Sequence, residues 1–231
     1  MPSYKHLFFD LDHTIWDFHT NQIVTLKKLF QDYRLERYFK DFDDFFERYM
    51  PINLDLWQQY KYGWIPKKDI KVGRFYKTFR GAGLDDLKTA ENFANEFVRG
   101  NSEQTGVIPH TFDVLEYLKQ KQYHLHIITN GFREAQHTKM DRSGLTPYFE
   151  NIFISEDIGA SKPDQRFFEH VIKTVSARKD ESLVIGDSLE NDIKGARDSG
   201  LDHVFFNPQQ TAHTEKVFKE ITSLKELIGW L

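Results

Sequence analysis

The chain has 231 residues, a formal net charge of −4 and no cysteine. Its 35 acidic and 31 basic residues nearly balance, so the charge favours neither a nucleic acid nor a membrane as the partner. The lack of cysteine excludes disulfides and thiolate zinc sites. The first apolar run stops at Asp10, too early for a secretory signal, and no stretch approaches the ~20 apolar residues of a membrane span. We therefore expect a cytoplasmic protein that acts on a small soluble molecule.

Five short apolar runs have the length and composition of buried strands. They cover residues 6–12, 125–129, 152–155, 183–186 and 204–206. Apolar residues at helical spacing separate the later runs, as at Phe112, Leu115 and Leu118. Strands that alternate with helices predict an α/β fold, a Rossmann-like parallel sheet with helices on both faces. In such sheets the ligand binds beyond the carboxyl ends of the strands, where the strand order reverses.

The long segment between the first and second runs predicts an inserted domain. More than a hundred residues separate the two runs, too many for one crossover connection. Phe42, Phe45, Phe46 and Tyr49 follow one another at i, i+3, i+4 and i+7, and we expect most such aromatic side chains to form the core of a helical domain. We predict a catalytic core of residues 1–16 and 100–231 and a helical cap domain of residues 17–99.

Two acidic side chains, Asp10 and Asp12, stand at the end of the first predicted strand. The two-residue period of a strand puts both carboxylates on one side of the backbone. At the end of a buried strand such a pair is costly unless a cation offsets it, and hard oxygen ligands suit Mg²⁺. The other interpretation is a strand-ending turn with solvated acids.

Groups that suit a phosphate or a cation also follow the next three predicted strands. They are Thr129-Asn130-Gly131, Ser161-Lys162-Pro163-Asp164, Gly186-Asp187 and Asn191-Asp192. A hydroxyl, an amide and exposed backbone N–H groups bind phosphate, and a lysine adds a compact positive charge. Taken singly, each motif can also be a turn, a solvated lysine or a helix cap. Their order along the chain, each at a strand end, favours one shared site.

This set of four motifs resembles the haloacid dehalogenase superfamily over the whole chain, with the Asp-x-Asp-x-Thr pattern at Asp10, Asp12 and Thr14. The resemblance implies a five-stranded Rossmann-like core with a helical cap inserted after the first motif. It also implies a phosphatase that works through an aspartyl-phosphate intermediate. Such an intermediate divides a very slow hydrolysis into two easier displacements.

The resemblance further implies a role for each motif. Asp10 would be the nucleophile, and Asp12 the general acid and base. Thr129 and Lys162 would bind the phosphate, and the strand-end chemistry adds Asn130 to them. Magnesium would be held by Asp10, the main chain of Asp12, Asp187 and, less directly, Asp192.

Other activities in the superfamily remain alternatives. A 2-haloacid dehalogenase displaces halide, which leaves without a proton, and it lacks a second acid at the place of Asp12. The presence of Asp12 with Asp187 and Asp192 therefore favours phosphoryl transfer. A sugar-phosphate phosphatase or a phosphoglucomutase-like enzyme shares the four motifs and stays open. A non-catalytic binding module is disfavoured because every catalytic position is filled.

Several segments are similar to one branch of the superfamily, the pyrimidine 5′-nucleotidases. They are residues 128–132 and 154–159 and, in the cap, Asn53, Leu56, Trp57, Tyr60, Gly63, Gly73, Arg74 and Phe75. The similarity implies a nucleoside monophosphate such as UMP, dUMP or dTMP as substrate, with Asn53 and Arg74 as candidate contacts. Alternatively, Asn53 caps a helix and Arg74 is a solvated cation. The base, the sugar, the oligomeric state and the role of His13, where the superfamily commonly has glycine, are left open.

Overall fold

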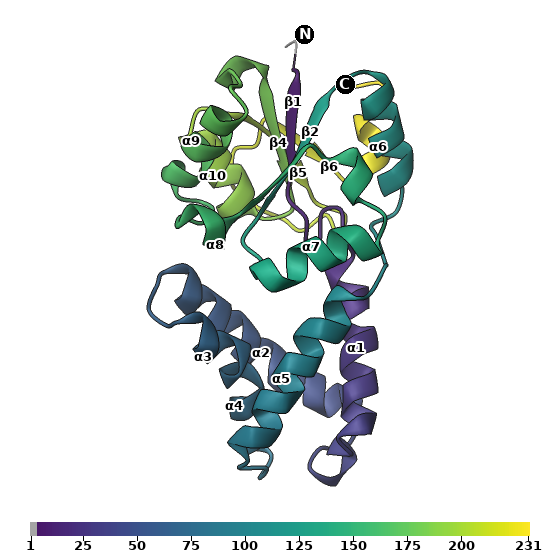
Figure 1. Cartoon of the computed structure of the whole chain (residues 1–231), viewed down its shortest axis with the longest axis vertical. Helices are drawn as coiled ribbons and strands as arrows, with labels where there is room; N and C mark the ends of the chain where they lie inside the picture. Colours follow the sequence, from purple (N-terminus) through teal and green to yellow (C-terminus); the bar gives the residue numbers. More distant parts are fainter. Residues whose placement is uncertain (1–3) are drawn as a thin grey trace. The chain divides into compact units, whose positions relative to one another are not determined.

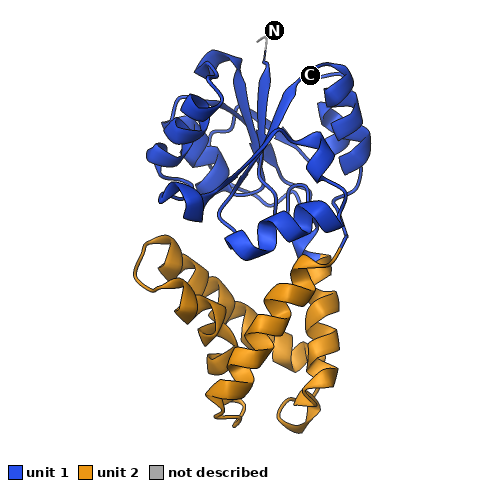
Figure 2. Cartoon of the chain, in the orientation of Figure 1, with its two compact units in different colours: residues 1–19, 105–231 blue, residues 20–104 orange. Residues whose placement is uncertain are grey.

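The computed structural model describes residues 4–231 and divides into two compact units (Figures 1 and 2). Unit 1 comprises residues 1–19 and 105–231, and unit 2 comprises residues 20–104. The sequence predicted a cap domain that begins at residue 17 and ends at residue 99. Both boundaries lie later in the structure, because the first helix of unit 2 begins only at Phe18 and its last helix continues to Ser102.

Within residues 4–231, unit 1 is built on a six-stranded parallel sheet in the order β3-β2-β1-β4-β5-β6. The strands are β1 (His6–Phe9), β2 (His124–Thr129), β3 (Asn151–Ile154), β4 (Ser182–Gly186), β5 (Asp202–Phe206) and β6 (Lys219–Ile221). The predicted α/β class is confirmed, but the expected count of five strands is wrong. The sixth strand is three residues long and carries Lys219 and Glu220, so it has no apolar run to reveal it.

Helices cover both faces of this sheet (Figure 1). They are α6 (Thr111–Gln120), α7 (Arg133–Arg142), α8 (Ser155–Ile158), α9 (Gln165–Thr174) and α10 (Gly195–Asp198), with a π-helical turn η4 (Leu189–Lys194) and single 3₁₀ turns η2 (Thr146–Tyr148), η3 (Lys179–Glu181) and η5 (Leu224–Leu227). Leu7 and Phe9 pack in one core with residues of α6, whereas Phe8 packs in another with residues of α9. Both faces of β1 are therefore buried, which explains its continuous apolar sequence.

The strand order reverses at β1, which lies between β2 and β4. Phe9, the last residue of β1, is in register with Ile127 of β2 and Ile185 of β4. The carboxyl ends of these three strands consequently meet at one edge of the sheet. Asp10 follows β1 directly and so stands at the switch point, the usual ligand site of such sheets.

The two chain segments that connect unit 1 to unit 2 pair with each other beside this edge. The Ile108 amide donates to the Ile15 carbonyl at 2.9 Å, and the Asp17 amide to the Gly106 carbonyl at 3.1 Å. Trp16, which stands between Ile15 and Asp17 in the chain, is fully buried, and its indole Nε1 donates to the Ser143 hydroxyl at 3.0 Å. The segment after the first motif is thus held firmly on unit 1.

Unit 2 is helical, with a core rich in aromatic rings. Its helices are α1 (Phe18–Asp32), η1 (Leu35–Arg37), α2 (Phe42–Lys61), α3 (Lys67–Lys71), α4 (Gly73–Gly81) and α5 (Leu87–Ser102). Phe45, Tyr49, Phe75, Phe79 and Phe93 are fully buried in it, and the Tyr49 and Phe75 rings stack at 5.2 Å. The aromatic spacing therefore marks packing between helices, as expected. Among residues 4–231, no helix combines the length and apolarity that crossing a bilayer requires.

Candidate active site

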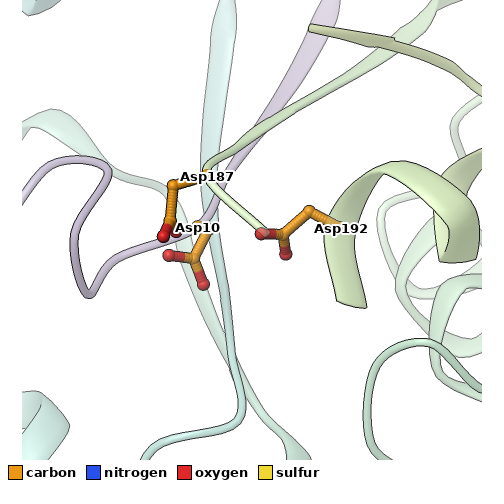
Figure 3. A group of neighbouring side chains, drawn as sticks. All are labelled: Asp10, Asp187 and Asp192. Atoms are coloured by element: carbon orange, nitrogen blue, oxygen red, sulfur yellow. The ribbon is translucent and has the colours of Figure 1, made fainter. Parts of the chain in front are cut away.

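Three carboxylates converge at the switch point of the sheet. Asp10 follows β1, Asp187 follows β4, and Asp192 lies in η4, the turn after that strand. One oxygen of each lies within 4.8 Å of the others, and Figure 3 shows the three side chains pointing toward one another. Asp10 is 8% exposed and Asp192 only 1%. The structure thus brings together three of the predicted metal ligands: Asp10 from the end of β1, and Asp187 and Asp192 from the segment that follows β4.

Lys162 joins this group from the loop before α9. Its Nζ donates to Asp10 Oδ1 at 2.6 Å, to Asp192 Oδ1 at 2.6 Å and to the Ile128 carbonyl at 3.0 Å. The side chain is 2% exposed, and all three ammonium hydrogens have an acceptor. This geometry fixes the orientation of the Asp10 carboxylate.

The close carboxylates perturb one another. Burial raises the pKa of Asp10 well above its usual range; the Lys162 ammonium acts in the opposite direction, and Asp192 and Asp187 add to the rise. Burial, followed by the Asp192 carboxylate, raises the pKa of Asp187 to about 7. For Lys162 burial alone would lower the pKa, but the carboxylates of Asp10 and Asp192 outweigh it and raise the pKa.

The charge balance of this group fits a divalent cation. Among the described residues the group consists of three carboxylates paired with the single Lys162 ammonium, so two negative charges remain when all are ionised. A buried surplus of charge is costly without a counterion. Carboxylate oxygens are the ligands that Mg²⁺ prefers in proteins, so the donor chemistry and the charge both suit that ion.

The Asp12 carboxylate lies apart from this group and has its own partners. Lys139 Nζ contacts Asp12 Oδ1 at 2.6 Å and Oδ2 at 2.8 Å, and Gln136 Nε2 contacts Oδ2 at 3.3 Å. Both partners come from α7, where they stand one turn apart. They were not identified from the sequence, although a polar pair at i and i+3 in the helix that follows the Thr-Asn-Gly motif was a usable signal.

The Thr129-Asn130-Gly131 segment shapes the loop after β2. The Gly131 amide donates to the Thr129 hydroxyl at 3.0 Å. Asn130 Nδ2 donates to the Lys162 carbonyl, and the Lys162 amide donates to Asn130 Oδ1, both at 2.9 Å. The Asn130 side chain was expected to bind phosphate. In the structure both ends of its amide instead hold the backbone of Lys162.

Two glycines allow the close packing of this site. A Cβ atom at Gly131 would lie 1.6 Å from Gln136 Nε2, and one at Gly186 would lie 2.4 Å from Asp192 Cγ. Neither position can therefore accept a side chain without displacing a residue of the site. His13, by contrast, is exposed and has a left-handed φ of 73°, the conformation that glycine adopts most easily.

The two predicted cap contacts, Asn53 and Arg74, meet inside unit 2. Arg74 Nη1 donates to Asn53 Oδ1 at 3.0 Å, and the Tyr49 hydroxyl donates to the same oxygen at 3.2 Å. Asn53 lies inside α2, and Arg74 is 2% exposed. The alternatives of a helix cap and a solvated cation are therefore wrong. The substrate role of these residues stays a prediction.

A cavity of about 440 Å³ in unit 1 adjoins the acidic group on the β5 side. Its lining includes Asp187, Ser188, His13, Phe205 and Asn207. The Asn207 amide is occupied, because its Nδ2 donates to the Thr211 carbonyl and to Glu220 while its Oδ1 accepts from the Thr211 amide. Of the three carboxylates, Asp187 is the one that borders this cavity.

A family model described as haloacid dehalogenase-like hydrolase matches residues 7–206. The chain belongs to the haloacid dehalogenase-like hydrolase family. It matches pyrimidine 5′-nucleotidase PynA of Streptococcus pneumoniae with 32% identity over 99% of this chain and 95% of PynA. It matches pyrimidine 5′-nucleotidase YjjG of Escherichia coli with 29% identity over 96% of this chain and 95% of YjjG.

A solved structure of a family member supports the same fold. It is the HAD-hydrolase YfnB of Bacillus subtilis bound to magnesium, with a TM-score of 0.87, 32% identity and coverage of 97% of this chain and 96% of that chain. With these relatives, this family member is a phosphatase, a hydrolase of phosphoric monoesters.

Proposed function

We propose that this hydrolase removes the phosphate from pyrimidine nucleoside 5′-monophosphates, with Mg²⁺ as cofactor and an aspartyl-phosphate intermediate on Asp10. The observation that carries the proposal is the separation of two acids that stand two residues apart. Asp10 is held by Lys162 in the acidic group, while Asp12 is held by Lys139 outside it. The Asp10 carboxylate is thereby suited to attack phosphorus, and the Asp12 carboxylate is suited to donate and accept protons.

In the first step a carboxylate oxygen of Asp10 attacks phosphorus, and the bond from phosphorus to the nucleoside oxygen breaks. Asp12 in its protonated form gives its proton to that oxygen, and the nucleoside leaves. In the second step Asp12 takes a proton from a water molecule that attacks the phosphorus of the aspartyl-phosphate. Inorganic phosphate leaves and both carboxyl groups return to their starting forms.

The remaining residues of the site balance the charge of the phosphoryl group. The Lys162 ammonium, beside the Asp10 oxygen, would place a positive charge next to the phosphoryl group as the new bond forms. The Thr129 hydroxyl and the backbone amides after β2 would bind the other oxygens. Magnesium, held by Asp10, Asp187, Asp192 and the main chain of Asp12, would supply further neutralisation of the developing charge.

The nucleoside part of the substrate is assigned from the relatives and from unit 2. Two relatives matched over 95% of their own length are named pyrimidine 5′-nucleotidases. In unit 2 the Arg74 guanidinium is buried, its Nε has no hydrogen-bond partner, and no carboxylate of the described residues forms an ion pair with it. A buried cation with an unused donor suits a polar substrate, which supports Arg74 and Asn53 as substrate contacts.

A panel of phosphate esters tests the proposal. We expect UMP, dUMP and dTMP to be hydrolysed with higher kcat/KM than purine monophosphates or sugar phosphates, and EDTA to abolish turnover until Mg²⁺ is added back. Asp10→Asn should lose both turnover and acid-stable labelling by ³²P-substrate, while the exposed control Asp113→Asn keeps them. A preference for sugar phosphates would refute the nucleotide assignment, and full activity of Asp10→Asn would refute the nucleophile.

A further inference from the structure

We propose that Lys139 is a positioning residue for the acid and base Asp12, and that its ammonium sets the orientation in which Asp12 meets the substrate oxygen. The inference rests on the proposed function, in which Asp12 moves the protons. Lys139 lies on α7, outside the four motifs of the sequence, and its ammonium forms an ion pair with Asp12.

The Lys139 ammonium contacts both carboxylate oxygens of Asp12. Lys139 Nζ lies 2.6 Å from one carboxylate oxygen of Asp12 and 2.8 Å from the other. A cation that bridges both oxygens fixes the plane of the carboxylate as well as its distance. Each carboxylate oxygen can accept two hydrogen bonds. Oδ2 accepts from both Lys139 and Gln136, whereas Oδ1 accepts from Lys139 and keeps a lone pair for a substrate or a water molecule.

Lys139 is itself held in place by the segment that follows the first motif. Its Nζ lies 4.6 Å from the centre of a Trp16 ring and 5.2 Å from that of Phe18. Its side chain is 3% exposed, and the indole of Trp16 is anchored by its hydrogen bond to Ser143. An ammonium packed against aromatic faces and shielded from water has few other positions, so it can act as a rigid support.

The Asp12 side chain needs such a support more than the Asp10 side chain does. Asp12 lies beyond the end of β1 in the turn that leads to Trp16, and its side chain is 21% exposed. A carboxylate in a turn can adopt several rotamers, and only those within hydrogen-bond reach of the leaving oxygen transfer a proton. The site therefore uses two buried lysines, Lys162 for Asp10 and Lys139 for Asp12.

A double-mutant cycle separates positioning from general stability. We expect Lys139→Met to lower kcat on UMP by ~10- to 100-fold, part of the ~10²- to 10⁴-fold that general acid–base catalysis provides, with KM changed less than about threefold. In an Asp12→Asn background the same substitution should cost little more. Lys139→Arg should restore part of the rate. Lys219→Met removes a lysine 4.9 Å from the Trp230 ring and should keep wild-type kinetics.

The leaving group gives a second readout. The p-nitrophenolate ion leaves without a proton, so Lys139→Met should lose about tenfold less kcat/KM on p-nitrophenyl phosphate than on UMP. Equal losses on the two esters, or additive losses in the cycle, would overturn the role of Lys139 while leaving the proposed phosphatase intact. Full activity of Asp12→Asn would overturn both proposals. Should Lys139→Met fail to fold, Lys139→Gln takes its place in the same cycle.

Discussion

A buried histidine far from the acidic group predicts how the fold responds to acid. His126 on β2 is 1% exposed, and its two ring nitrogens face the side chains of His6 and Asn151. Its Nε2 is 3.1 Å from His6 Nδ1, and its Nδ1 is 3.1 Å from the amide nitrogen of Asn151. Because that amide nitrogen can only donate, Nδ1 of His126 must accept and stay unprotonated. The folded protein therefore resists a second proton on this ring.

The size of the effect follows from the pKa of this group. Burial, followed by the charge of His6, lowers the pKa of His126 from 6.5 to about 4. As the pH falls below 6.5 the unfolded chain takes up a proton at His126, whereas the folded protein does so only near pH 4. The free energy of unfolding should therefore fall by up to about 3 kcal/mol over this interval, at ~1.4 kcal/mol per unit of pKa difference. Above pH 6.5 the contribution is constant.

Urea titrations at pH 7.5 and pH 4.5 test this reasoning. His126→Gln keeps a donor and an acceptor but cannot titrate, so its loss of stability between the two pH values should be smaller than that of the wild type by about 2 to 3 kcal/mol. The exposed control His170→Gln should lose as much as the wild type. If His126→Gln and the wild type lose the same amount, the buried histidine does not carry the acid sensitivity.

Three further predictions concern the site. In Gly186→Ala the new Cβ would lie 2.4 Å from Asp192 Cγ. We therefore expect kcat on UMP to fall by about tenfold or more. An unchanged kcat would show that Asp192 can move without loss of activity. Asp187→Asn should raise the Mg²⁺ concentration for half-maximal activity by ~10- to 100-fold, and an unchanged value would remove Asp187 from the metal site. Arg74→Met should raise KM for UMP by about tenfold without affecting p-nitrophenyl phosphate, and equal effects on both would refute a nucleoside contact.

Much of the fold was predictable because buried parallel strands carry a strong local signal. Five apolar runs located β1 to β5, and the aromatic spacing in residues 42–49 located a buried helix face. The strand β6 was not predicted because only Ile221 of its three residues is buried. The division between the units lies a few residues later than predicted because α1 begins only at Phe18 and α5 continues to Ser102.

The sequence by itself determined which chemistry is present and where along the chain it stands. Asp10, Thr129 and Asp187 each mark the end of a strand, and Lys162 lies in the loop between α8 and α9 that follows β3. A parallel sheet brings such ends to one edge, so their meeting could be inferred without coordinates. Only the tertiary structure decided the partners of each group. Asn130 holds the Lys162 backbone, Lys139 holds Asp12, and Arg74 turns inward onto Asn53. Those choices depend on side-chain packing between elements distant in sequence, which local pattern and spacing do not encode.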